Sequence, residues 1–261
     1  MNVDLTGKNA LVCGGSKGIG RAIAEELASQ GANVIVAARS ADLLAQIVTE
    51  LPNSVTQNHG FLVIDMEDHD DMIKKVRTLS LSKPIHILIN NSGGPPGGPI
   101  LEAQPDEFTK AMQRHLLASH HLVKLLAPGM KKEGYGRIIN VISTSVKEPI
   151  AGLGVSNTTR GAVASWAKTI SMELGPFGIT VNNVLPGFTR TERLESLVKI
   201  WADQRSISVS EMENELFNSV PMGRFADPGE VGAVAAFLAT PAASYLTGVS
   251  LAVDGGRTKC L

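Results

Sequence analysis

A glycine-rich turn near the amino terminus constrains the fold of this chain more than any other feature. An apolar run at residues 10–12 leads into Gly14, Gly18 and Gly20 and then into a helical pattern at 21–30. Glycine reaches backbone conformations that other residues avoid, and it lets a ligand approach the main chain. The free N–H groups at the start of the next helix favour a phosphate. The turn therefore predicts a dinucleotide site, although its Gly-x3-Gly-x-Gly spacing also suits a plain strand–helix turn.

Short runs rich in Val and Ile alternate with longer helical patterns along the rest of the chain. This alternation is typical of β-α-β units, which build a parallel sheet covered by helices on both faces. We therefore predict a single α/β domain over residues 1–261, a Rossmann-type doubly wound sheet of seven parallel strands. The predicted strands are 10–12, 33–38, 60–64, 85–89, 137–142, 179–185 and 250–253. A polar stretch at about 189–220 predicts an inserted helical lid over the substrate.

Composition excludes several classes of protein. The net charge of −1 gives no electrostatic reason to expect nucleic acid or a membrane surface as a partner. Two cysteines, Cys13 and Cys260, form no disulfide framework and suit a reducing compartment. The chain begins without a basic-then-apolar leader, and no apolar run approaches the roughly 18 residues of a spanning helix. We expect a cytoplasmic protein that binds a small molecule.

The residues after the second predicted strand indicate which nucleotide binds. Ala38 stands where a carboxylate usually binds the ribose 2′-hydroxyl, and Arg39 follows it. Arginine offers paired hydrogen bonds to a 2′-phosphate, and Lys17 in the glycine turn adds a second positive charge. Either residue alone is more often a solvated surface charge. Together, without a carboxylate, they favour NADP(H).

Further polar or small residues follow other strands, where ligands of open α/β sheets lie. Asp65 ends the third strand and is either a ligand of the adenine amino group or a cap of the next helix. The amides of Asn90 and Asn91 are expected to tie neighbouring strand ends together, and Gly93 lets the ribose approach. Thr191 lies at a distance suited to the nicotinamide amide or the phosphates.

Together these residues resemble the short-chain dehydrogenase/reductase family over essentially the whole chain, and most of all its 3-oxoacyl-[acyl-carrier-protein] reductases. The resemblance rests on the glycine turn, Asp65, Asn90 to Gly93, Ser143, Pro186-Gly187 with Thr191, and the tail Tyr245-Leu246-Thr247-Gly248 with Val253-Asp254-Gly255-Gly256. It implies a nicotinamide cofactor, carbonyl/alcohol redox chemistry and an NADPH-dependent homotetramer. In such a tetramer the helices at 105–130 and 155–174 pair across a two-fold axis, and the last strand makes a second interface.

The catalytic pattern departs from the one that the resemblance implies. The family has Tyr-x-x-x-Lys thirteen residues after the serine, and counting from Ser143 reaches Ser156 and Arg160. The long helix at 105–130 carries His115 where the family usually has Asn. The sequence is therefore similar to a divergent subgroup with Ser and Arg in place of the catalytic Tyr and Lys.

A serine hydroxyl is a much weaker acid than tyrosine, whose pKa is near ~10. Arg160 is one helical turn from Ser156, so it can polarise that hydroxyl or reach the nicotinamide ribose, but it cannot relay a proton. Tyr135 and Tyr245 each precede a strand and fall at the opposite edge of the sheet. His115, with a reference pKa near ~6.5, is either the substitute acid or a helix histidine bonded to a carbonyl. Lys147, in the loop after Ser143, is a weaker candidate.

The predicted site thus has two parts and no metal. The candidate catalytic residues are Ser143, Ser156, Arg160 and His115. The candidate cofactor-binding residues are Gly14, Ser16, Lys17, Gly18, Ile19, Gly20, Arg39, Asp65, Met66, Asn91, Ser92, Gly93, Arg160, Pro186, Gly187, Thr189 and Thr191. We expect an NADP(H)-dependent reductase of a 3-oxoacyl-thioester-like or other ketone, with an altered proton donor. The alternative is a catalytically impaired NADP(H)-binding sensor or scaffold protein.

Overall fold

Seven apolar strands form one parallel sheet in the computed structural model of the chain, which describes residues 1–260. The order across the sheet is β3-β2-β1-β4-β5-β6-β7. The strands are β1 (Asn9–Cys13), β2 (Asn33–Ala38), β3 (Gly60–Val63), β4 (Ile87–Asn90), β5 (Gly136–Val141), β6 (Ile179–Pro186) and β7 (Ser250–Val253). The predicted fold class is confirmed, and β2 and β7 have the predicted bounds.

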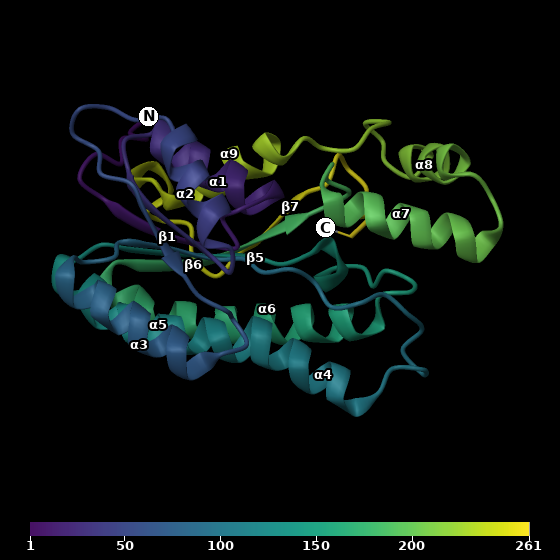
Figure 1. Ribbon diagram of the computed structural model, residues 1–261, viewed down its shortest axis with the longest axis horizontal. Coiled ribbons are helices and arrows are strands. Elements are labelled where there is room, and N and C mark those ends of the chain that lie inside the picture. Colours follow the sequence, from purple (N-terminus) through teal and green to yellow (C-terminus); the bar gives the residue numbers. More distant parts are fainter. Residues whose placement is uncertain (261) are drawn as a thin grey trace.

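Helices cover both faces of the sheet, in two layers that Figure 1 shows above and below it. The upper layer contains α1 (Gly18–Ser29), α2 (Ala41–Glu50) and α9 (Pro228–Ala239). The lower layer contains α3 (His69–Ser82), α4 (Pro105–Met112), α5 (Ala118–Glu133) and α6 (Gly154–Leu174).

Each strand between these layers buries both of its faces. In β2, Val34 and Val36 pack in the core between the sheet and the upper helices. Ile35 and Ala37 pack in the core between the sheet and the lower helices. Burial on both sides explains why the strands are continuous apolar runs rather than alternating ones.

The helical pattern predicted over residues 105–130 is not one regular helix. A π-helical segment, η1 (Gln113–Leu117), separates α4 from α5. A π turn holds one more residue than an α turn, so it changes which side chains face the sheet. His115 lies within η1 and is 4% exposed.

The stretch predicted as a lid folds into two helices, α7 (Glu192–Arg205) and α8 (Val209–Asn218), which project to one side of the sheet in Figure 1. They pack on a small apolar core of their own, which includes Leu194, Val198 and Met212. The lid residues Leu197 and Trp201 face the cleft described below, whereas Ile200 is exposed. The segment is therefore held together independently of the main core.

Within residues 1–260, no helix combines the length and the apolar character needed to cross a membrane. Cys13 is buried in β1, and Cys260 is exposed; neither forms a disulfide. Leu261, the last residue of the predicted domain, lies outside the described residues.

Candidate active site

A cleft of about 960 Å³ crosses the carboxyl ends of the strands. Every candidate cofactor-binding residue named above lines this cleft, from Gly14 in the turn to Thr191 before α7. Of the candidate catalytic residues, Ser143, Ser156 and Arg160 line it as well. The strand order changes direction between β1 and β4, so the cleft lies where open α/β sheets bind their ligands.

The glycine turn is shaped by close contacts that allow no side chain. Gly14 has a φ of +59°, in the left-handed region that glycine favours. A Cβ on Gly20 would overlap the carbonyl oxygen of Gly14. The Asn91 amide donates to the carbonyls of Cys13 and Gly14, each at 3.3 Å, which confirms that it ties the ends of β4 and β1 together. Gly18, Ile19 and Gly20 at the start of α1 line the cleft, so the turn fits a diphosphate.

Arg39 lines the cleft beside Ala38, the last residue of β2. Its guanidinium takes part in none of the ion pairs formed among residues 1–260. Asp65 accepts a hydrogen bond from the backbone N–H of Glu67 at 3.0 Å, while the cap of α3 is Asp68. Asp65 is thus not the helix cap that the sequence left open as an alternative.

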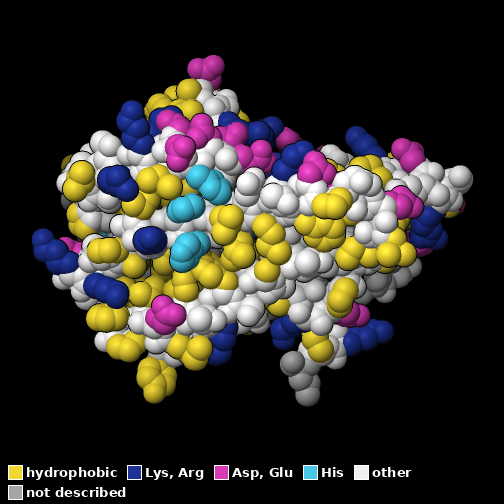
Figure 2. Space-filling view, turned by 90° about the horizontal axis from the view of Figure 1, so that it is seen from below, with side chains coloured by type: hydrophobic (Ala, Val, Ile, Leu, Met, Phe, Trp, Pro, Cys, Tyr) yellow, Lys and Arg dark blue, Asp and Glu magenta, His cyan; other side chains and the backbone are white. Residues whose placement is uncertain are grey.

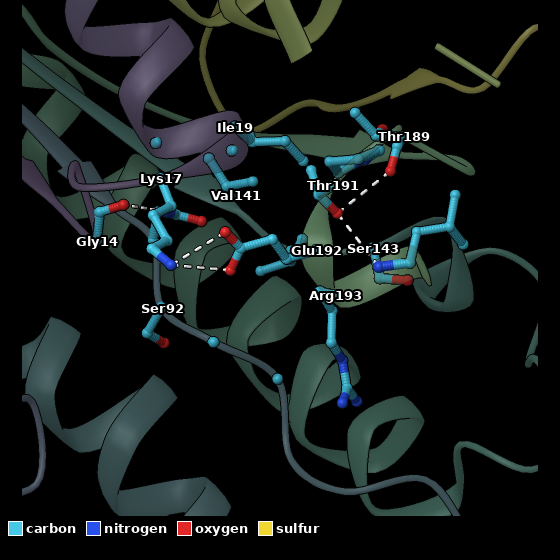
Figure 3. A pocket seen from close by; sticks show the side chains of 18 of the residues that line it. Gly14, Lys17, Ile19, Ser92, Val141, Ser143, Thr189, Thr191, Glu192 and Arg193 are labelled. Atoms are coloured by element: carbon cyan, nitrogen blue, oxygen red, sulfur yellow. Dashed lines mark hydrogen bonds and ion pairs between the residues drawn. The ribbon is translucent and has the colours of Figure 1, made fainter. Parts of the chain in front are cut away.

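Lys17 is not directed at a phosphate position in this structure. Its Nζ lies 2.9 Å from a carboxylate oxygen of Glu192, the first residue of α7. Figure 3 shows these two side chains pointing toward one another across the cleft. Both are exposed, at 60% and 74%, so water screens the pair. The lid and the glycine turn therefore meet through an ion pair.

Asparagines form a ladder across the strands at this edge of the sheet. Asn90 donates to Asn140 at 2.8 Å, and Asn140 donates to Asn183 at 2.9 Å. Asn183 in turn donates to the hydroxyl of Ser250 at 3.0 Å. The three asparagines are buried and occupy paired register positions of β4, β5 and β6. Side-chain hydrogen bonds thus hold four strands together beneath the cleft.

Arg160 lies inside the protein, one helical turn after Ser156 on α6. Its Nη1 donates to the carbonyl of Val141 at 3.0 Å, and its Nε is buried without a partner. Burial, with a further contribution from the positive charge of Arg193, lowers the pKa of Arg160 to about 10. The guanidinium therefore stays protonated at neutral pH. Ser143, at the end of β5, accepts a hydrogen bond from the N–H of Ser145 at 3.1 Å.

His115 does not line the main cleft. It lines an adjoining cavity of about 10 Å³, together with Asn90, Ser92 and Arg160. Its Nδ1 lies 2.7 Å from the hydroxyl of Ser92, which does face the cleft. Burial, followed by the positive charges of Arg160 and Arg114, lowers the pKa of His115 to about 2. The ordinary imidazole pKa that made His115 attractive as an acid is therefore not retained in the fold.

A family model described as Enoyl-(Acyl carrier protein) reductase matches residues 14–258, which include the glycine turn, the asparagine ladder and the candidate catalytic residues. The chain belongs to the short-chain dehydrogenase/reductase family.

Known short-chain dehydrogenases/reductases match the chain over almost its whole length. It is 35% identical over 257 residues to a tropinone reductase homolog of Arabidopsis thaliana, covering 97% of this chain and 92% of that protein. It is also 35% identical over 257 residues to the 3-oxoacyl-[acyl-carrier-protein] reductase FabG of Vibrio harveyi, covering 97% of this chain and 98% of that protein. The solved structure of L-sorbose reductase from Gluconobacter frateurii, complexed with NADPH and L-sorbose, superposes with a TM-score of 0.92 at 28% identity and covers 100% of both chains.

This short-chain dehydrogenase/reductase has no tyrosine in its cleft. The hydroxyl of Tyr135, before β5, donates to the carbonyl of Ala239 at 2.6 Å, and Tyr245 is fully exposed. Neither tyrosine lines the cleft, which confirms that they lie away from the catalytic positions. Lys147 does not line the cleft either.

Several arginines of this short-chain dehydrogenase/reductase lie at the site although the sequence did not predict them as site residues. The cleft is also lined by Arg114, Arg190, Arg193 and Arg257. Arg190 and Arg193 lie close in the chain to Thr191, which was predicted to bind the cofactor. This closeness in the sequence could have indicated that both arginines lie at the site. No sequence signal of this kind indicated Arg257, because its position depends on how the tail folds back. The guanidinium carbon of Arg257 lies 4.8 Å from the ring centre of Phe188.

Proposed function

We propose that this protein is an NADP(H)-dependent reductase that converts a ketone or a 3-oxoacyl-type carbonyl compound to an alcohol. The observation that carries the proposal is that one cleft contains all candidate cofactor-binding residues together with Ser143, Ser156 and Arg160. In this proposal a serine–arginine pair replaces the tyrosine–lysine pair of the family. When bound, NADPH supplies the hydride.

Residues along the cleft fit the successive parts of that cofactor. Gly14, Gly18 and Gly20 line the cleft at the start of α1, where a diphosphate is favoured. Arg39, with no carboxylate at Ala38, suits the adenosine 2′-phosphate. The NADPH bound in the sorbose reductase structure supports the same choice.

At the other end, the hydroxyls of Ser143 and Ser156 are proposed to donate hydrogen bonds to the carbonyl oxygen of the substrate. Arg160 remains positively charged and stabilises the negative charge that develops on this oxygen. Ser156 gives its proton to the oxygen and regains one from water in the open cleft. Because a serine is a weak acid, this transfer depends on the nearby guanidinium.

His115 is proposed to act through Ser92 rather than on the substrate. A ring with a pKa of about 2 donates no proton as an imidazolium near pH 7. Its hydrogen bond to Ser92 instead fixes the orientation of a hydroxyl beside the cofactor. His115 is thus a positioning residue in this proposal.

Oxidation of NADPH by the purified protein, followed by absorbance with a panel of ketones and 3-oxoacyl thioesters, tests the proposal. Replacing Ser156 with Ala is expected to lower kcat about 100-fold while leaving the affinity for NADPH unchanged. Thr158→Ala, an exposed change on the same helix, is the matched control and should keep full activity. Equal activity of Ser156→Ala and Thr158→Ala would contradict the assigned role of Ser156.

The second candidate is an NADP(H)-binding sensor or scaffold protein. The absence of both tyrosines from the cleft favours it, since the usual proton donor is missing. Tight NADPH binding without turnover of any carbonyl compound in the panel would support this alternative and reject the reductase.

We also propose a homotetramer in the cytoplasm. Figure 2 shows apolar and histidine side chains together on the face formed by the lower helices. Leu117 and Met172 are exposed there, at 43% and 65%. Leu251 on the edge strand β7 is 41% exposed and suits a second interface. The mass in solution tests this assembly, and a mass near that of one chain, 27.6 kDa, would reject it.

A further inference from the structure

Two arginines converge on the loop that follows β4. Arg160 comes from α6, and Arg193 comes from the first turn of α7. The point that a Cβ of Gly94 would occupy lies 3.8 Å from the Nη2 atom of each arginine. The two Nη2 atoms are therefore at most twice that distance apart. Positive charges at such a separation repel each other, and an anion that lies near both would offset this repulsion.

No carboxylate of residues 1–260 forms an ion pair with either arginine. Arg193 donates to the carbonyl of Pro95 at 2.6 Å, and Arg160 donates to that of Val141. These carbonyls orient the guanidiniums but do not neutralise them. The buried Nε of Arg160 has no hydrogen-bond partner among residues 1–260.

Two other basic residues that line the cleft do have a carboxylate partner. Lys17 is paired with Glu192, and Arg114 is paired with Glu67. Figure 3 shows Arg193 extending away from the Lys17–Glu192 pair, although it follows Glu192 directly in the chain. The charge of Arg193 is thus separated from the nearest acid of its own helix and lies beside Arg160.

The surroundings of the two arginines also favour a ligand. Gly94 leaves the space between them open, because it has no side chain. Leu153, Leu197 and Trp201 line the same cleft and provide apolar surface for the rest of a small molecule. This combination suits a compact molecule with one anionic group and an apolar body.

We propose that Arg160 and Arg193 bind a carboxylate of the substrate, so that the reduced compound is a 2-oxo acid rather than a neutral ketone or a thioester. This inference rests on the proposed reductase function. A guanidinium matches a carboxylate through paired hydrogen bonds. Ser156 and Arg160 are one helical turn apart, roughly 5–6 Å between Cβ atoms, so they reach neighbouring groups of one molecule. In a 2-oxo acid the carbonyl and the carboxylate are adjacent.

The test compares 4-methyl-2-oxopentanoate with its methyl ester, which keeps the carbonyl and removes the charge. The native protein is expected to reduce the acid with the higher kcat/KM. Arg193→Gln should lower kcat/KM for the acid on the order of 10- to 100-fold, with little change for the ester or for NADPH affinity. Arg193→Lys, which keeps a positive charge, should recover part of the loss.

Arg205→Gln is the matched control, because Arg205 lies on the same helix and pairs with Glu215 away from the cleft. It should leave the preference for the acid unchanged. Equal kcat/KM for acid and ester in the native protein would overturn the proposal while leaving the reductase function intact. Loss of NADPH affinity in Arg193→Gln would also overturn it, by assigning the arginine to the cofactor. A preference for dihydroxyacetone phosphate over dihydroxyacetone, with none for the 2-oxo acid, would assign the pair to a phosphate instead.

A binding measurement separates this inference from the reductase proposal. Trp201 lines the cleft, and a Trp166→Phe background leaves it as the single tryptophan of the chain. With NADP⁺ present, the acid should change its fluorescence at concentrations at which the ester does not, even if no turnover occurs. The same response in the Arg193→Gln variant would reject the carboxylate site.

Discussion

Ser92 and His115 join the loop after β4 to the π-helical segment η1 through a contact of 2.7 Å. The imidazole ring is 4% exposed, and the nearby Arg160 and Arg114 are both positive. A proton on this ring would be a third positive charge in a poorly hydrated place. The site therefore contains a neutral histidine at a position for which the sequence left open a substitute acid or a structural histidine.

The neutral state of His115 makes stability depend on pH. The pKa of His115 falls from 6.5 to about 2 on folding. Between these values the unfolded chain binds a proton at His115 that the folded chain does not, so the contribution of His115 to stability rises with pH up to about 6.5 and is then constant. Replacing His115 with Asn should remove this dependence. Urea unfolding at pH 5 and pH 7.5 should show a smaller difference for the variant than for the native protein, and an equal difference would contradict the prediction.

Gly20→Ala is expected to weaken cofactor binding on the order of 10- to 100-fold. Its Cβ would overlap the carbonyl oxygen of Gly14, so the turn must move away from the phosphates. Hydrogen bonds from the N–H groups of the turn to the phosphates would then be lost, and titration of NADPH fluorescence would detect the weaker binding. Gly229→Ala on α9, where a Cβ meets no atom within 4 Å, is the control and should bind NADPH normally. Normal binding by Gly20→Ala would mean that the turn does not hold the diphosphate.

Arg39 is expected to decide between the two nicotinamide cofactors. Arg39→Ala should weaken NADPH binding about 10- to 100-fold, because charge-assisted hydrogen bonds to the 2′-phosphate are lost. NADH, which lacks this phosphate, should bind equally well to the variant and the native protein. Parallel titrations with both cofactors check the prediction, and an equal loss for both would remove Arg39 from the phosphate site.

Glu192→Gln should strengthen NADPH binding by about 2- to 10-fold. The change removes a negative charge that lines the cleft and releases Lys17 for a phosphate. The gain should shrink as salt is raised, since the groups are exposed. Glu213→Gln, on the second lid helix and outside the cleft, should show no gain. Weaker binding by Glu192→Gln would mean that the ion pair holds the lid in its binding position.

Much of this fold could be predicted because its signals are local. The Val- and Ile-rich run of β2 and the glycine turn before α1 each depend on a few consecutive residues. The candidate catalytic positions Ser143 and Ser156 came from the resemblance to the short-chain dehydrogenase/reductase family, whose pattern was counted along the chain. Local strand patterns also placed the tyrosines away from the cleft.

The remaining features depend on residues that are distant in the sequence. The π-helical segment around His115 contains one residue more per turn than the flanking α-helices. A helical pattern in the sequence is recognised over many residues, so a single extra residue does not interrupt it. The lowered pKa of His115 depends on Arg160, which reaches it from another helix. The pairing of Lys17 with Glu192 and the approach of Arg193 to Arg160 depend on where the lid lies. Hydrophobic periodicity in the sequence does not predict contacts between residues that are so far apart in the chain.

The asparagine ladder has an electrostatic consequence for the small cavity that Arg160 lines. Every amide of the ladder donates toward β7, so the dipoles of Asn90, Asn140 and Asn183 are aligned. Aligned hydrogen bonds polarise one another, and the electron-rich end of this series is Oδ1 of Asn90, a buried acceptor without a partner. That oxygen belongs to a residue lining the same small cavity as Arg160. The sheet thus turns the electron-rich end of an aligned series of amides toward a cavity whose lining, among residues 1–260, includes Arg160 but no carboxylate.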